Sequence, residues 1–178
     1  MRLNPGKAKK MMYALIAAIA VGWPLMELVQ AASDRHDPYE AVRLLHQVSV
    51  FQMDGLYSRL QQAESAETAG ELEGLLHSAY AAQYTHERLM LAAGAGEKPL
   101  ASVDALIQYI LRLQMGIGGH LTAKDSEVFR EAADLFEELH NPYRRLIGSD
   151  GKLNSSNETA VWRADEALHR VFRQKLLE

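Results

Sequence analysis

Two Glu-x-x-His motifs are the residues of this chain whose types and spacing best match a known chemistry. One motif runs from Glu137 to His140 and the other from Glu166 to His169. Residues three apart lie on one face of a helix. Two such pairs, together with carboxylates from two further helices, bind two metal ions in ferritin-like bundles. The motifs therefore raise the hypothesis of a di-metal site.

Helical phase argues against that hypothesis, because both members of each pair must point into the core. At about 100° per residue, the apolar face of the helix that carries the first motif centres near Phe136. His140 lies roughly 60° from that centre, whereas Glu137 lies roughly 120° away and points largely to water. The last helix repeats the arrangement, with His169 beside the apolar face and Glu166 outside it. We therefore predict solvated acids next to partly buried histidines.

Four histidines from four predicted helices form a second candidate for metal or cofactor binding. They lie on or beside apolar faces, where converging imidazoles can hold a metal or haem. The set is His46, His86, His140 and His169. Packed histidines that donate to a neighbouring carbonyl occupy the same kind of position. No spacing places the four at one level of a bundle, so we predict no catalytic residue, no cofactor and no metal, and keep these four as the candidates.

The composition and charge exclude several classes of protein. The chain has 178 residues and no cysteine, which excludes zinc–thiolate sites, thiol catalysis and lipoprotein attachment. Beyond residue 31 it carries 15 basic and 22 acidic residues, a net charge of −7. Nucleic-acid binding requires a basic face for the phosphates, so we expect no nucleic-acid partner.

An apolar run at residues 11 to 26, preceded by four basic residues, indicates export. It is slightly longer than the roughly 7–15 residues of a signal-peptide core and shorter than the about 20 of a membrane-spanning helix. Pro24 and the small residues around Ala31 favour a signal peptide cleaved after Ala31, whereas the length favours a membrane anchor. In both alternatives residues 1–31 are the leader, and residues 32–178 form an extracytoplasmic domain.

The extracytoplasmic domain shows helical periodicity throughout, which predicts an all-α fold. One helix should begin at Pro38 after the capping residue Asp37 and run to about Ala63. Further helices are predicted near residues 71–94, 100–117 and 122–141, and a last one from about residue 157. The expected architecture is an antiparallel bundle of four to five amphipathic helices, preceded by an N-terminal hydrophobic helix.

Local signals mark several helix boundaries. Thr68 with Glu71, and Thr122 with Asp125, match the capping-box pattern, in which the two side chains satisfy backbone N–H groups at a helix start. Pro142 predicts a kink or an interruption, because proline lacks the N–H that an internal helical residue donates.

Polar residues on apolar faces, and opposite charges on two helices, predict contacts between helices. Gln83 lies on an apolar stripe and needs a partner, for which His46 and Tyr80 are the candidates. The helix near residues 122–141 is rich in acids and the last helix is rich in bases. We therefore expect these two helices to be neighbours.

The layout of an apolar leader followed only by amphipathic helices resembles two groups of proteins. One is the helical sensing domains of bacterial receptors, and the other is the accessory membrane proteins of bacterial spore germination. The shared features are the leader and the entry Leu121-Thr122-x-x-Asp125 into a helix. This resemblance implies an accessory, sensing or spore-envelope role and assigns no residue.

The function expected from these observations is non-enzymatic. We predict an exported or membrane-anchored helical bundle of the bacterial cell envelope that acts through protein–protein contacts with a partner of unknown identity. Residues 11–26 would contact the membrane if the leader is not cleaved. The alternative is a metal- or cofactor-binding bundle that uses the core-facing histidines.

Overall fold

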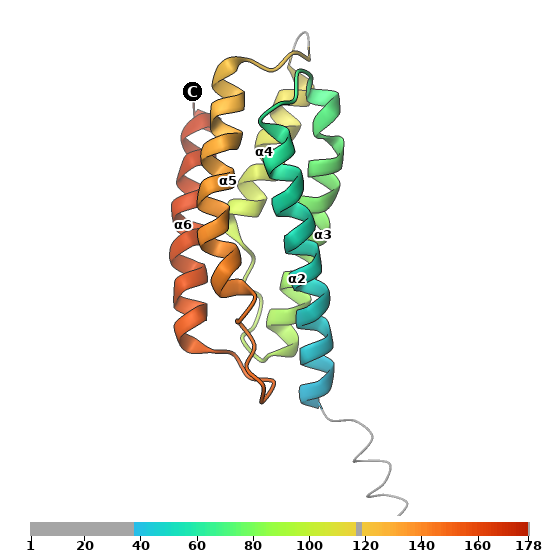
Figure 1. Cartoon of the computed structure of the whole chain (residues 1–178), viewed down its shortest axis with the longest axis vertical. Coiled ribbons are helices and arrows are strands. Elements are labelled where there is room, and N and C mark those ends of the chain that lie inside the picture. Colours follow the sequence, from blue (N-terminus) through green and yellow to red (C-terminus); the bar gives the residue numbers. More distant parts are fainter. Residues whose placement is uncertain (1–37, 117–118, 178) are drawn as a thin grey trace, which may run out of the picture. The chain divides into compact units, whose positions relative to one another are not determined.

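The computed structural model describes residues 38–116 and 119–177, and within them it shows a helical bundle (Figure 1). The elements are α2 (Pro38–Ala63), the short 3₁₀ helix η1 (Ala69–Leu72), α3 (Glu73–Ala92), α4 (Ala101–Met115), α5 (Ala123–Tyr143) and α6 (Ser155–Leu177). Consecutive α-helices run in opposite directions. The predicted all-α bundle is confirmed for these residues.

The predicted hydrophobic N-terminal helix, with the leader that contains it, lies outside the described residues. Among the helices that are described, none is both long enough and apolar enough to cross a membrane.

The buried residues of α2 follow the spacing of a helix that packs along a single seam. Its buried positions recur at alternating intervals of three and four residues, which keeps one face toward the neighbouring helices. They are Val42, His46, Ser49, Met53, Leu56, Leu60 and Ala63. The helix begins at Pro38 and ends at Ala63, as the sequence predicts.

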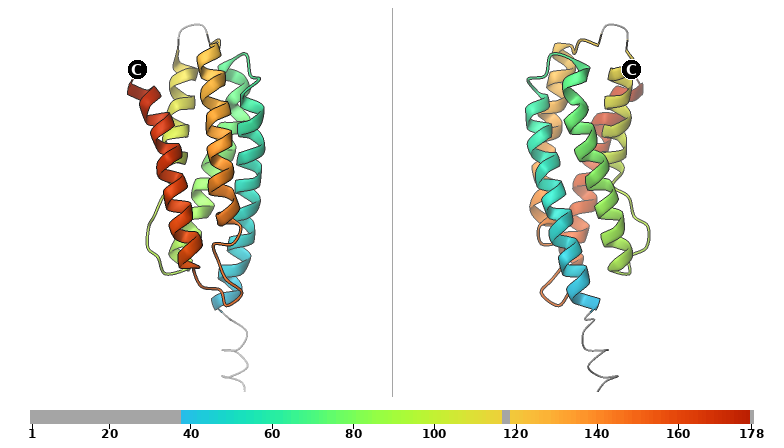
Figure 2. Two further views of the ribbon diagram at one scale, coloured as in Figure 1. Left: turned by 60° about the vertical axis from the view of Figure 1, so that its left-hand side comes forward. Right: turned by 90° about the vertical axis from the view of Figure 1, so that its right-hand side faces the viewer.

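Each helix of the bundle packs against two neighbours, an arrangement that Figure 2 shows from two sides. Helix α6 packs against α5 and α4, and α4 also packs against α3. Helix α2 contacts α3 through the Ser49 hydroxyl, which donates to the Thr85 carbonyl at 3.0 Å. It contacts α5 through Tyr57, whose ring stacks on Phe136. The predicted pairing of the acidic α5 with the basic α6 is confirmed.

The two predicted capping boxes have different outcomes. At the start of α5, the Thr122 hydroxyl accepts from the Asp125 N–H, and the Asp125 carboxylate accepts from the Thr122 N–H, so this box is confirmed. At the other site the Thr68 side chain caps no backbone group; its hydroxyl donates to Glu71 at 2.8 Å. The chain there forms η1 before α3 begins, so the second prediction is wrong.

The C-terminal turn of α5 contains Pro142 without ending there. The helix continues one residue further, to the fully buried Tyr143. The residue four positions before Pro142, whose carbonyl loses its usual donor, is the exposed Glu138. Water can satisfy that carbonyl, so proline is tolerated in this turn.

The loop between α5 and α6 folds back onto the first turn of α2. Gly151 in this loop has φ +72°, and a Cβ placed on it would lie 2.5 Å from Tyr39 Cβ. Both the backbone conformation and the close approach therefore require glycine. The Lys152 ammonium lies over the same Tyr39 ring, 6.0 Å from its centre.

Candidate functional site

Tyr143 brings two of the four candidate histidines together inside the bundle. His46 Nε2 lies 3.0 Å from the Tyr143 carbonyl oxygen, to which it donates. His86 Nε2 lies 2.9 Å from the Lys98 carbonyl and donates to it. His86 Nδ1 must then be the acceptor for the Tyr143 hydroxyl, 3.0 Å away. Tyr143 thus joins α5 to α2 and to α3.

Burial keeps the His86–Tyr143 pair uncharged near neutral pH. His86 is fully buried, and burial lowers its pKa to about 4, although the bond to the Lys98 carbonyl acts in the opposite direction. Burial also raises the pKa of the Tyr143 hydroxyl. Both nitrogens of His86 are engaged, so this imidazole has no lone pair left for a metal.

Lys98 ties the same network to α6 through its side chain. Its ammonium lies 3.0 Å from the Glu158 carboxylate and 5.7 Å from the centre of the Trp162 ring. The hydrogen bond from Lys98 holds the pKa of Glu158 below its usual value. Trp162 in turn meets the His86 ring edge-on. Lys98 therefore fixes the connection between α3 and α4 in two ways, through its backbone carbonyl and through its side-chain ammonium.

The third candidate histidine, His140, pairs with an acid on α2. Its Nε2 lies 2.5 Å from Asp54 Oδ1, and its ring stacks on Tyr57 and Phe136. The histidine side chain is 9% exposed and the aspartate 45%. This pair links α5 to α2 at the edge of the core.

The fourth candidate, His169, lies apart from the other three. It is half-buried and lines a surface depression between α4 and α6, together with Asp104 and Arg173. Glu137 and Glu166 are exposed, so the predicted solvation of both acids is confirmed. Of the two histidines beside them, His169 is half-buried as predicted, whereas His140 is buried. Among the described residues, no three His, Asp or Glu side chains are grouped so that they would hold a metal ion.

The N-terminus of α4 is a polar cluster that the sequence did not reveal. The buried Asp165 of α6 accepts from the N–H groups of Ala101 and Ser102, at 3.1 and 3.0 Å, and from the Ser102 hydroxyl at 2.5 Å. Gln83 of α3 accepts from the Leu100 N–H at 3.3 Å. Side chains from two other helices thus accept hydrogen bonds from the free backbone N–H groups at the start of α4.

Gln83 has partners other than those expected. Its amide nitrogen donates to Asp104 at 3.0 Å, so the prediction of His46 or Tyr80 as the partner is wrong. Burial raises the pKa of Asp104, as does the nearby Asp165, while the bond from Gln83 lowers it. A sequence signal did exist, because a buried amide must find a partner, but it did not say on which helix.

The outer face of α2 carries three large apolar side chains that water reaches. Leu44 is 57% exposed, Val48 48% and Phe51 71%. Their spacing of four and three residues puts them in one stripe, opposite the buried seam of the same helix. We call these three residues the α2 stripe.

Comparisons with protein-family models, with curated proteins and with solved structures find no match to this chain.

Proposed function

We propose that this chain is a non-enzymatic, exported or membrane-anchored bundle of the bacterial cell envelope that acts by binding another protein. The observation that supports this function best is the α2 stripe. We infer that the partner presents a complementary apolar surface, because the stripe offers no polar atom for recognition.

The exposure of the α2 stripe favours association energetically. Full burial of a leucine, valine or phenylalanine side chain contributes roughly 1.5–3 kcal/mol. Covering three side chains that are about half exposed therefore contributes roughly 3 kcal/mol to binding. Tyr80 and Tyr84 on α3 are also exposed, but each keeps a hydroxyl for water, and Arg88 lies over the Tyr84 ring.

The engagement of the interior polar groups supports a structural role for them. Two of these groups bind backbone carbonyls: His46 donates to that of Tyr143, and His86 donates to that of Lys98. Asp165 accepts from the Ser102 N–H at the start of α4. Each bond therefore ties one helix to a neighbouring segment. In the described residues, every buried side-chain nitrogen and oxygen has a hydrogen-bond partner. The core-facing histidines of the metal- or cofactor-binding alternative thus have packing roles.

The export part of the proposal rests on the leader in the sequence. The basic residues before the run at 11–26 favour a cytoplasmic N-terminus and an exported body.

Co-purification from the native cells tests the binding function. The tagged full-length chain is cross-linked, purified and compared with a Leu44→Lys, Phe51→Lys variant. We expect the variant to recover less than about a tenth of the partner that the unaltered chain recovers. A loss of about 1.4 kcal/mol of binding free energy already lowers the affinity tenfold.

The matched control replaces an exposed aromatic residue outside the stripe, Tyr84→Lys. Both variants change surface positions, where a substitution alters stability by about 0.5 kcal/mol or less. The control should recover the partner at the level of the unaltered chain. Equal recovery by all three proteins would contradict the proposal.

A further inference from the structure

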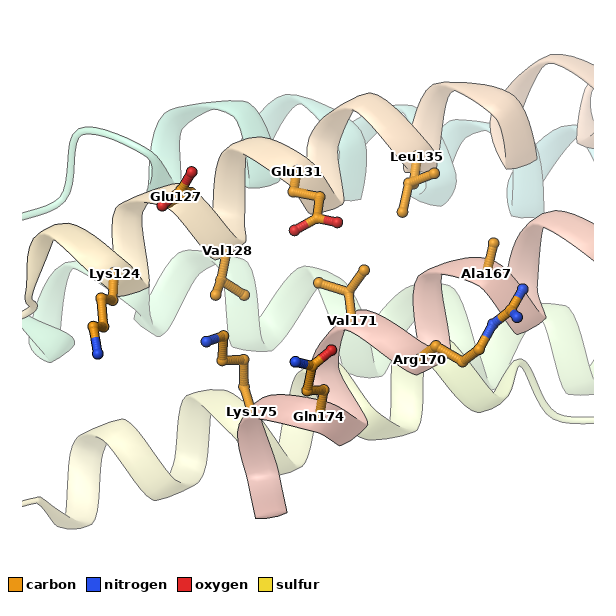
Figure 3. A pocket seen from close by; sticks show the side chains of 10 residues that line it. All are labelled: Lys124, Glu127, Val128, Glu131, Leu135, Ala167, Arg170, Val171, Gln174 and Lys175. Carbon is orange, nitrogen blue, oxygen red and sulfur yellow. The ribbon is translucent and has the colours of Figure 1, made fainter. Parts of the chain in front are cut away.

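A groove of about 520 Å³ runs along the surface between α5 and α6 (Figure 3). Its floor is apolar and comes from both helices. Val128 and Leu135 belong to α5, and Ala167 and Val171 to α6. Val128 is buried, whereas the other three are only half-buried. The floor is thus a strip of small and medium apolar side chains that water still reaches.

The two walls of the groove carry opposite charges. Glu127 and Glu131 rise from α5, and Arg170 and Lys175 rise from α6, on the two sides of the apolar strip (Figure 3). Lys124 adds a positive charge at one end of the α5 wall. Glu127 already contacts Arg130 of its own helix at 3.4 Å, but this pair is exposed and contributes little.

The length and charge pattern of the groove fit a helix better than a small molecule. From Lys124 to Leu135 the α5 wall rises about 16 Å, or roughly three helical turns. Small-molecule sites place a few polar groups so that they converge on one point, whereas these charges are spread along two walls. A helix laid in such a groove anchors apolar side chains on the floor and pairs its two flanks with the walls.

We propose that the α5–α6 groove binds an amphipathic helix of a partner protein, one with a narrow apolar ridge, basic residues on one flank and acidic residues on the other. The basic flank lies along Glu127 and Glu131, and the acidic flank along Arg170. This inference rests on the proposed function only in that the chain acts through protein contacts. It concerns residues other than the α2 stripe.

Synthetic helices test the charge pattern with purified protein, independently of any cellular partner. Three labelled peptides of about 20 residues share one apolar ridge of alanine and leucine. One has a lysine flank and a glutamate flank, one has two lysine flanks, and one has two glutamate flanks. We expect fluorescence anisotropy to show the mixed-flank peptide binding about tenfold more tightly than either other peptide. A ranking in which it is no tighter than either would overturn the proposal.

Changing one wall should change the preferred peptide. Gln174 lines the α6 wall one helical turn after Arg170. The Arg170→Glu, Gln174→Glu variant makes this wall acidic, so the peptide with two lysine flanks should become the tightest binder. The Glu131→Lys variant makes the opposite change on α5 and should favour the peptide with two glutamate flanks. Because two variants on two helices are used, the test still stands if one of them fails to fold by circular dichroism.

A control variant separates the groove from the overall charge. Arg163→Glu, Gln108→Glu changes the net charge by the same amount as the α6-wall variant, at exposed positions that do not line the groove. It should keep the preference for the mixed-flank peptide. A switch of preference in this control, or none in the two wall variants, would show that the groove is not the binding site.

Discussion

At the scale of single residues, Tyr143 sets the structure of the bundle end where α5 finishes. Its carbonyl accepts from His46 of α2, and its hydroxyl donates to His86 of α3. The ring is fully buried. Two candidate metal-binding histidines therefore act as links between helices, and the buried His86 must stay neutral for the fold to keep its full stability.

The first prediction concerns the pH dependence of that stability. The pKa of His86 is about 4 in the folded chain and about 6.5 when unfolded. Between these values the unfolded state binds the extra proton, so stability is fully present above pH 6.5 and is lost as the pH falls toward 4. Urea unfolding should show the free energy of unfolding falling by about 3 kcal/mol more between pH 7 and pH 4 than in His86→Gln. Equal losses in the two proteins would refute this role for His86.

The second prediction concerns Asp165. The Asp165→Ala substitution removes the acceptor for the N–H groups of Ala101 and Ser102 at the start of α4. We expect it to lower the free energy of unfolding by about 2 kcal/mol or more, because partly buried donors lose their partner. Its exposed neighbour provides the control, since Glu166→Ala should change stability by about 0.5 kcal/mol or less. If both variants unfold at the same urea concentration, Asp165 does not cap α4.

The burial of single residues could be predicted from helical phase, but their partners could not. Helical phase places His140 at the edge of the apolar face and Glu137 in water, and the structure shows His140 buried and Glu137 exposed. Helical phase could not show that Asp54, 86 positions away from His140, is the partner of that histidine. Periodicity gives the angle of a side chain around its own helix, and it carries no information about the neighbouring helix.

At the scale of elements, the starts of α5 and α4 show which boundaries a sequence reveals. Helix α5 is capped by Thr122 and Asp125, which are three residues apart, so the pattern is visible locally. Helix α4 follows Leu100, which has no capping side chain, and takes its cap from Asp165. A cap supplied from another helix leaves no local pattern.

The loop between α5 and α6 supplies the third prediction, which compares two glycines. Gly94 has φ +77° with open space around it, whereas Gly151 has φ +72° and faces Tyr39 closely. Gly94→Ala should lower stability by about 1 kcal/mol through the backbone conformation alone. Gly151→Ala should lower the free energy of unfolding by roughly 1–3 kcal/mol more than Gly94→Ala does, because the added methyl group overlaps Tyr39.

Thermal unfolding of the two glycine variants measures the difference. A melting temperature for Gly151→Ala that is no lower than that of Gly94→Ala would mean that the loop does not need its contact with Tyr39.

At the scale of the whole molecule, we propose two surfaces of the described residues as binding sites for partners. One is the α2 stripe, and the other is the α5–α6 groove. Neither could be recognised from the sequence, because an apolar residue outside the main seam looks the same whether another helix covers it or water does. Only the positions of all the helices show which apolar side chains remain exposed.

The fourth prediction concerns the compartment of the chain. Fractionation of native cells should place it on the extracytoplasmic side, and N-terminal sequencing should separate the two alternatives for the leader. A mature chain that begins at Ala32 indicates a cleaved signal peptide, and a membrane-bound chain that begins at Met1 indicates an anchor. An intact chain in the cytosolic fraction would contradict export.

The proposal that this bundle works by binding a protein is tested most directly by photo-crosslinking at the α2 stripe in living cells. A photoreactive amino acid replaces Val48 in one variant and the exposed Glu138 of α5 in another. We predict a light-dependent adduct with one defined protein from position 48, and no such adduct from position 138. No protein adduct at position 48, or the same adducts from both positions, would contradict the proposal.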